Sequence, residues 1–185
     1  MMKLRQMLLN YTPCDMQEAQ DRQMMLDALD NLQDVFTRKN QFAHFTASSW
    51  IVNQNRDHAL MAYHNIYRTW AWTGGHADGE TDLMKVAIRE AQEETGIADI
   101  GPFSGEIYSI EVLPVNPHVK RGSFVSAHLH LNVTFLLVAD DRQKIQCRPD
   151  ENSAVAWLPL AQAENNPDEP YMSAIYRKLN GKLPR

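Results

Sequence analysis

Apolar residues recur at spacings of three and four along residues 16–36, with charged residues between them. This period predicts an amphipathic helix, and Pro13 interrupts the pattern closer to the start of the chain. Residues 1–40 are therefore expected to be helical, and we assign residues 1–45 to an N-terminal helical extension. The extension is expected to pack on the following domain or at a homodimer interface.

From Thr46 onward the pattern changes to short alternating or apolar runs. Residues 46–53 and 58–64 are predicted to form a hairpin, because polar turn residues separate them. Further extended segments are expected at residues 67–75, 105–115, 124–138 and 153–160. The run at 124–138 is the longest, and its fully apolar end is typical of a buried central strand.

Two helices are expected among these strands. Residues 83–95 show helical spacing, with a capping residue at position 81 or 82 and a C-terminal stop at Gly96. Residues 171–179 are predicted to form a closing helix. Strands, one strongly marked helix, more strands and a terminal helix together indicate an α/β domain with a mixed sheet between helices.

Composition is consistent with one such domain, which we assign to residues 46–185. The 185 residues are 44% hydrophobic and 22% charged, as in ordinary globular proteins. A net charge of -5 argues against a nucleic acid polymer or an anionic membrane as partner. Cys14 and Cys147 form no CxxC pair, which favours a reducing cytoplasm. No apolar run approaches the roughly 20 residues of a membrane-spanning helix.

Three glutamates crowd one side of the helix predicted at 83–95. At about 100° per residue, Glu90, Glu93 and Glu94 fall within roughly a 100° arc. Like charges at these spacings destabilise a helix, and the macrodipole disfavours them near its C-terminal end. Either water screens them or a cation offsets them, and carboxylates are ligands that Mg²⁺ and Mn²⁺ prefer. The Gly-rich turn at 72–80 would let backbone groups approach a phosphate or a metal.

The stretch from Gly75 to Ile97 resembles the Nudix box. That motif reads Gly, five residues, Glu, seven residues, Arg-Glu, an aliphatic residue, any residue, Glu-Glu, any residue, Gly and an aliphatic residue. The register holds without a gap, and the matching residues after the glycine are Arg89, Glu90, Glu93, Glu94, Gly96 and Ile97. Thr81 stands where the family has its first Glu, with Glu80 one residue earlier, and Ala91 replaces a bulkier aliphatic residue. The resemblance implies a Nudix-type α/β/α sandwich with a mixed sheet.

Nudix hydrolases cleave a diphosphate linked to another group, usually a nucleoside. The resemblance therefore implies a pyrophosphohydrolase that uses Mg²⁺ or Mn²⁺ and acts on a nucleoside diphosphate derivative. By this similarity, Glu90 and Glu94 are expected to bind the metal directly, and Glu93 to bind it or to hold a water. The Gly75 carbonyl would complete the site, and Arg89 would orient the carboxylates through charge-assisted hydrogen bonds.

The general base has two candidates. One is Glu94, and the other is Glu151, because many Nudix chains carry an acidic residue outside the box near this place; a surface charge is its competing interpretation. The departure at Thr81 raises the alternative of a catalytically weak or inactive ligand-sensing module with the Nudix fold. Isopentenyl diphosphate isomerases share the fold but need a catalytic cysteine, and neither Cys14 nor Cys147 has a suitable setting.

Four residues are candidates for substrate binding. His76 lies beside the Gly pair, where the resemblance places the phosphates. His130 shares one strand face with His128, but zinc ligation by this pair lacks a third nitrogen or sulfur ligand nearby in sequence. Trp72 would stack on a base, and Arg121 would clamp a phosphate. The competing interpretations are core packing for the histidines and the tryptophan, and a solvated turn for the arginine.

Overall fold

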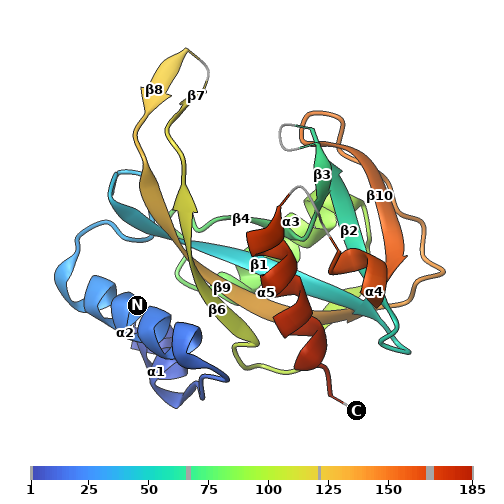
Figure 1. Cartoon of the computed structure of the whole chain (residues 1–185). Coiled ribbons are helices and arrows are strands. Elements are labelled where there is room, and N and C mark those ends of the chain that lie inside the picture. The colour runs from blue at the N-terminus through green and yellow to red at the C-terminus, as the bar shows by residue number, and fades with distance from the viewer. Residues whose placement is uncertain (1, 66–67, 121, 166–168, 185) are drawn as a thin grey trace. The chain divides into compact units, whose positions relative to one another are not determined.

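The computed structural model describes residues 2–65, 68–120, 122–165 and 169–184. The elements in chain order are α1 (Met2–Asn10), α2 (Met16–Asn31), β1 (Ala43–Asn53), β2 (His58–His64), β3 (Thr69–Ala71), β4 (Thr73–His76), α3 (Leu83–Thr95), β5 (Ile100–Pro102), β6 (Ser109–Val115), β7 (His118–Lys120), β8 (Ser123–Val125), β9 (His128–Ala139), β10 (Asn152–Pro159), α4 (Leu160–Ala163) and α5 (Pro170–Gly181). The predicted α/β class, mixed sheet and N-terminal helices are confirmed (Figure 1). None of the helices in these ranges combines the length and apolar character needed to cross a membrane.

The chain forms two compact units, each assembled from three segments. The first contains Met1–Ser48, Gly74–Val86 and Glu106–Phe135, and the second contains Ser49–Thr73, Ala87–Gly105 and Leu136–Arg185. Strands β1, β4 and β9 and helix α3 therefore contribute residues to both units.

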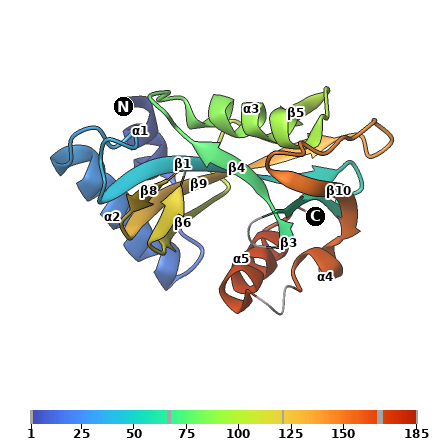
Figure 2. The ribbon, with the colours of Figure 1, turned by 90° about the horizontal axis from the view of Figure 1, so that it is seen from above.

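In the first unit, two helices lie beside a group of strands. β6 pairs antiparallel with β9, and β4 pairs with β1. Helices α1 and α2 lie side by side, and α2 packs beside β6 (Figures 1 and 2). There the Gln17 side-chain amide donates a hydrogen bond to the Ile110 carbonyl at 3.2 Å. The buried apolar side chains of this unit include Leu4, Leu8, Met25, Leu29, Phe45 and Val133.

A buried carboxylate fastens α2 to β6. Glu18 is fully buried and accepts hydrogen bonds from the Tyr11 hydroxyl at 2.6 Å and the Cys14 backbone N–H at 2.8 Å. The Ser109 hydroxyl of β6 lies 2.8 Å from its other oxygen. Burial and the bond to Glu18 raise the pKa of Tyr11, so this hydroxyl stays a donor. A buried carboxylate is tolerated only with such partners, which ties the N-terminal helices to the strands.

The second unit is built around β2. This strand pairs antiparallel with β10 and with β3, and it pairs with β1 through Val52 opposite Ala59. The short β5 pairs antiparallel with the end of β9. Trp50 of β1 stacks on Tyr176 of α5 with ring centroids 5.3 Å apart, and both side chains are buried. This aromatic pair fixes the closing helix on the strands.

The prediction of one continuous strand at 124–138 is wrong, because its first residues belong to a separate strand. β8 ends at Val125 and pairs with β7 in a separate two-stranded sheet, whereas β9 begins at His128. Gly122, with a φ of 79°, supplies the left-handed backbone that a tight turn before β8 requires. Phe124 is 72% exposed, so the apolar alternation here belongs to a hairpin arm rather than to the core.

We predict that Glu18→Ala destabilises the protein. The change removes the acceptor of the buried Tyr11 hydroxyl and of the part-buried Cys14 backbone N–H, at a cost of about 2–3 kcal/mol in free energy of unfolding. Urea unfolding followed by circular dichroism measures this loss. The control is Asp27→Ala on the exposed side of α2, where the carboxylate accepts a hydrogen bond from the exposed Gln23 side chain. Equal stability of the two variants would contradict the anchoring role.

Candidate active site

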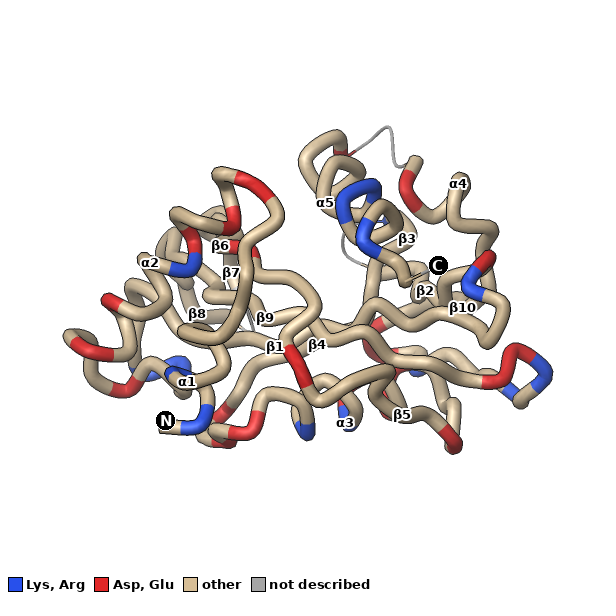
Figure 3. The backbone as a smooth tube through the Cα atoms, turned by 90° about the horizontal axis from the view of Figure 1, so that it is seen from below, with Lys and Arg blue, Asp and Glu red and all other residues tan. Residues whose placement is uncertain are grey.

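Helix α3 has the bounds predicted from the sequence. Its buried side consists of Leu83, Val86, Ala87 and Ala91, which recur at helical spacing. The pKa of Asp82 is lowered by its hydrogen bond to Lys3 and, further, by the backbone N–H of Lys85. Asp82 therefore serves as the capping residue in front of α3. Acidic and basic residues both occur along this helix (Figure 3).

The three box glutamates lie on one side of α3 but differ in exposure. Glu94 is 8% exposed, whereas the side chains of Glu90 and Glu93 are 17% and 45% exposed. Arg89 donates a hydrogen bond to Glu90 at 2.8 Å, and its Nε lies 3.9 Å from Glu93. The guanidinium group therefore offsets part of the repulsion that this spacing creates.

Arg148, which sequence reasoning missed, joins α3 to the segment before β10. It donates to Glu93 at 3.0 Å and lies 3.5 Å from Glu151. Attraction by Glu151 raises the pKa of Arg148, with further contributions from Glu93 and Glu90. One guanidinium group thus brings Glu151 beside the box carboxylates. The only sequence signal for this contact is the position of Arg148 three residues before Glu151.

The same segment satisfies backbone groups at the end of α3. The Asn152 side-chain amide donates to the Glu94 carbonyl at 2.9 Å, and the Gln146 N–H donates to the Thr95 carbonyl at 2.7 Å. Gly96 follows with a φ of 68°, and a Cβ there would lie 3.0 Å from the Gln146 Cβ. Glycine therefore permits both the turn and the close contact that hold the helix end.

Glu80 braces the loop in front of α3. Its carboxylate accepts a hydrogen bond from the Asp82 backbone N–H at 2.8 Å. This bond lowers the pKa of Glu80, and the Thr81 backbone N–H contributes as well. Thr81 itself is exposed. A carboxylate one residue before the usual family position thus bonds to the loop backbone.

The glycine pair and Trp72 occupy different settings. Gly74 and Gly75 belong to β4, and a Cβ on Gly74 would lie 2.5 Å from the Ser48 Oγ, so glycine allows β4 to approach β1. Trp72, in the second unit, packs edge-on against Tyr176 with ring centroids 5.6 Å apart. Its backbone N–H donates to the Tyr176 hydroxyl at 3.3 Å. Trp72 therefore packs on α5, and its stacking on a base stays a prediction.

His76 and His130 lie in a cluster of four histidines within the first unit. The ring centroid of His44 is 5.2 Å from that of His76, 5.0 Å from that of His128 and 5.1 Å from that of His130. The Nε2 atoms of His128 and His130 are 3.3 Å apart, as expected for one strand face. His44 was missed because strand pairing, not local spacing, brings it here. Arg121 lies outside the described residues.

Burial disfavours protonation of two of these imidazoles, those of His44 and His130. It lowers the pKa of His44, and it lowers the pKa of His130 to about 2, with the neighbouring histidines adding to the shift of His130. The Nδ1 of His44 lies 3.0 Å from the Asn40 carbonyl, which can only accept, so Nδ1 carries the proton. Among the described residues, the buried Nε2 of His44 has no hydrogen-bond partner.

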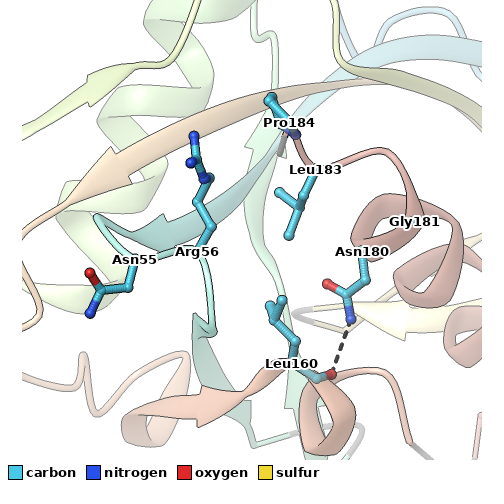
Figure 4. Close-up of a pocket in the computed structure, with 7 residues that line it drawn as sticks. All are labelled: Asn55, Arg56, Leu160, Asn180, Gly181, Leu183 and Pro184. Carbon is cyan, nitrogen blue, oxygen red and sulfur yellow. Dashed lines mark hydrogen bonds between the residues drawn. The ribbon is translucent and has the colours of Figure 1, made fainter.

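A cavity of about 480 Å³ lies in the second unit (Figure 4). Its lining consists of Asn55, Arg56, Leu160, Asn180, Gly181, Leu183 and Pro184. Asn180 donates to the Leu160 carbonyl at 3.0 Å. Arg56 is the only charged side chain in this lining, and no predicted site residue belongs to it. The cavity therefore contributes no set of groups suited to acid–base or metal chemistry.

Comparison with known folds places the chain among Nudix structures. The MutT protein from Methanosarcina mazei Go1 is 15% identical with a TM-score of 0.59, over 77% of this chain and 96% of that one. A C. elegans Ap4A hydrolase in a binary complex is 19% identical with a TM-score of 0.52, over 74% and 95%. A Nudix hydrolase from M. smegmatis is 13% identical with a TM-score of 0.54, over 78% and 90%. At such low identities, these TM-scores establish similarity of fold alone.

Sequence comparison identifies the family. No curated protein sequence matches the chain. The family model of the NUDIX domain matches residues 43–179, which span β1 to α5 and include the whole of the predicted box. Because this match covers well over half of the chain, the protein belongs to the NUDIX domain family and is a Nudix-type hydrolase of pyrophosphate bonds.

Proposed function

We propose that the protein is a divalent-metal-dependent hydrolase that cleaves a diphosphate linkage in a small phosphorylated substrate, a nucleoside diphosphate derivative. The proposal rests on the carboxylate set of the second unit, formed by Glu90, Glu93, Glu94 and Glu151. Arg89 and the Arg148 bridge hold three of these four carboxylates in place. Family membership supports the reaction class, and the donor set supports the metal.

The charge of this set suits a divalent cation. Four carboxylates stand against two guanidinium groups, so two net negative charges remain. The donors are oxygens, which Mg²⁺ and Mn²⁺ prefer to imidazole or thiolate ligands. Glu90 and Glu94, one helical turn apart, would hold the ion, and Glu93 would bind it or hold one of its waters.

The side chains divide the remaining work. A bound ion would neutralise phosphate charge and lower the pKa of a water ligand. Glu94 accepts the proton of the attacking water, and Glu151 is the second candidate for this role. Arg89 and Arg148 act as positioning residues, because each holds carboxylates through charge-assisted contacts.

Two further observations guide the choice of substrates to test and of the cellular compartment. Ap4A, named for the C. elegans neighbour, belongs in a substrate screen together with nucleoside diphosphate sugars and nucleoside triphosphates. Cys14 and Cys147 are thiols rather than the halves of a disulfide, which suits the cytoplasm.

Glu94→Gln is expected to abolish turnover. The amide keeps the shape of the side chain but removes the ligand charge and the proton acceptor, so kcat/KM should fall by at least about 100-fold. Phosphate release from the screened compounds in Mg²⁺ or Mn²⁺ measures the effect. The matched control is Glu106→Gln, an exposed carboxylate of the first unit, which should keep the parent rate.

The competing function is a ligand-sensing module with little or no hydrolysis. Tight binding of a phosphorylated compound without turnover of any compound in the screen would favour it and contradict the hydrolase. This alternative is supported by Thr81, which stands where the family has its first Glu. It is weakened by Glu80, whose carboxylate bonds to the loop backbone from the preceding position.

Arg148→Gln should separate metal binding from turnover. Loss of the cation makes the carboxylate set more negative, so the Mg²⁺ concentration for half-maximal rate should fall roughly two- to fivefold. Glu93 and Glu151 lose their shared partner, so kcat should fall about 10-fold. The control Arg142→Gln removes an exposed arginine that pairs with Asp140. If Arg148→Gln and this control had the same kcat and the same Mg²⁺ concentration for half-maximal rate, Arg148 would have no positioning role.

A further inference from the structure

A second donor set, different in chemistry from the carboxylates of α3, lies in the first unit. His44 comes from β1, His76 from β4, and His128 and His130 from β9. Ring nitrogens of His44, His76 and His130 lie within 4.8 Å of one another. We propose that His44, His76 and His130 bind a divalent transition-metal ion such as Zn²⁺. The ligands of this site are ring nitrogens, whereas the site proposed for Mg²⁺ or Mn²⁺ uses carboxylate oxygens.

The His44 ring is arranged as a metal ligand. Its Nδ1–H donates to the Asn40 carbonyl at 3.0 Å, which leaves the lone pair on Nε2. A ring N–H bonded to a backbone carbonyl, opposite the ligating nitrogen, is the usual outer-shell support of a metal-bound histidine. His44 is 4% exposed, and its Nε2 has no hydrogen-bond partner within the described ranges. A metal ion would supply the partner that this buried lone pair lacks.

The distances suit one ion after small ring rotations. Nitrogens bound at about 2.1 Å in a tetrahedral arrangement lie about 3.4 Å apart. The three donors lie within 4.8 Å of one another, so ring movements on the order of 1 Å bring them to one ion. The rings of His76 and His130 are already close, with centroids 4.8 Å apart.

His128 extends the same arrangement. Its Nδ1 lies 2.9 Å from the Ser126 carbonyl, which repeats the support seen at His44. Its Nε2 lies 3.3 Å from the Nε2 of His130, close to the separation of two ligands on one tetrahedral ion. His128 is therefore placed to become a fourth ligand, or to leave that position to water or to a phosphate oxygen.

The donor type selects the class of ion. Imidazole nitrogens bind Zn²⁺, Ni²⁺ and Cu²⁺ well, whereas Mg²⁺ prefers oxygens. A positive charge near the cluster would repel a metal cation. The nearby Arg38 forms an ion pair with Asp78 at 2.7 Å, and this carboxylate offsets the charge of the guanidinium group. The third nitrogen ligand that residues 128–130 lack in sequence is thus supplied by neighbouring strands.

Zinc binding in the presence of magnesium tests the proposal. The full chain is freed of metal by chelation and titrated calorimetrically with Zn²⁺ in excess Mg²⁺, which occupies the oxygen donors. We expect one equivalent of Zn²⁺ to bind. His44→Gln and His130→Gln should each weaken that binding at least about 100-fold. His118→Gln, at an exposed histidine of β7, and Glu94→Gln should both retain it.

Cobalt spectroscopy of the parent protein keeps the proposal testable if the histidine variants fail to fold. Co²⁺ bound to the parent protein should show the intense visible bands of a four-coordinate nitrogen site, and His76→Gln should reduce them. Weak bands of a six-coordinate oxygen site would overturn the proposal. Zinc binding that survives in His44→Gln and His130→Gln, or disappears in Glu94→Gln, would also overturn it. None of these readouts depends on hydrolysis, so their failure leaves the proposed reaction untouched.

Discussion

Repulsion among the carboxylates at the C-terminal end of α3 is the constraint on which the candidate site depends. Glu90, Glu93 and Glu94 stand where both their mutual charge and the helix dipole oppose them. Arg89 and Arg148 offset two of the charges, and hydrogen bonds from the Gln146 backbone N–H and the Asn152 side-chain amide hold the helix end. In the proposed chemistry, a divalent ion would neutralise the remaining negative charge of these carboxylates.

Local pattern was enough to predict α3 and the family to which the chain belongs. The apolar residues recur at helical spacing, Gly96 ends the helix, and the box residues follow in sequence, so all of this information lies within one short segment. Arg148 contacts Glu93 and Glu151, and His44 contacts His130, but neither residue could be found this way. Arg148 reaches Glu93 through the fold of a distant segment, and His44 meets His130 through neighbouring strands.

Burial of individual side chains was the other limit of sequence reasoning. The spacing in α2 predicts a helix, but a charged residue between apolar positions is expected to face water, whereas Glu18 is fully buried. Phe124 shows the reverse, because an apolar residue in an alternating run is exposed on a hairpin. In both cases the partners decide the outcome: Glu18 has Tyr11 and Ser109, and Phe124 lies on a two-stranded arm.

The two donor sets differ in what they offer a cation. The carboxylates of α3 offer net charge and hard oxygens, and this attraction is long-ranged and weakened by salt. The histidines offer lone pairs on ring nitrogens, so their attraction is short-ranged and depends on ring orientation. An ion that needs charge neutralisation is drawn to the first set, and an ion that forms strong bonds to nitrogen is drawn to the second. If both proposed sites bind as we expect, one chain would discriminate between a magnesium-type and a zinc-type ion through the type of ligand atom at each site.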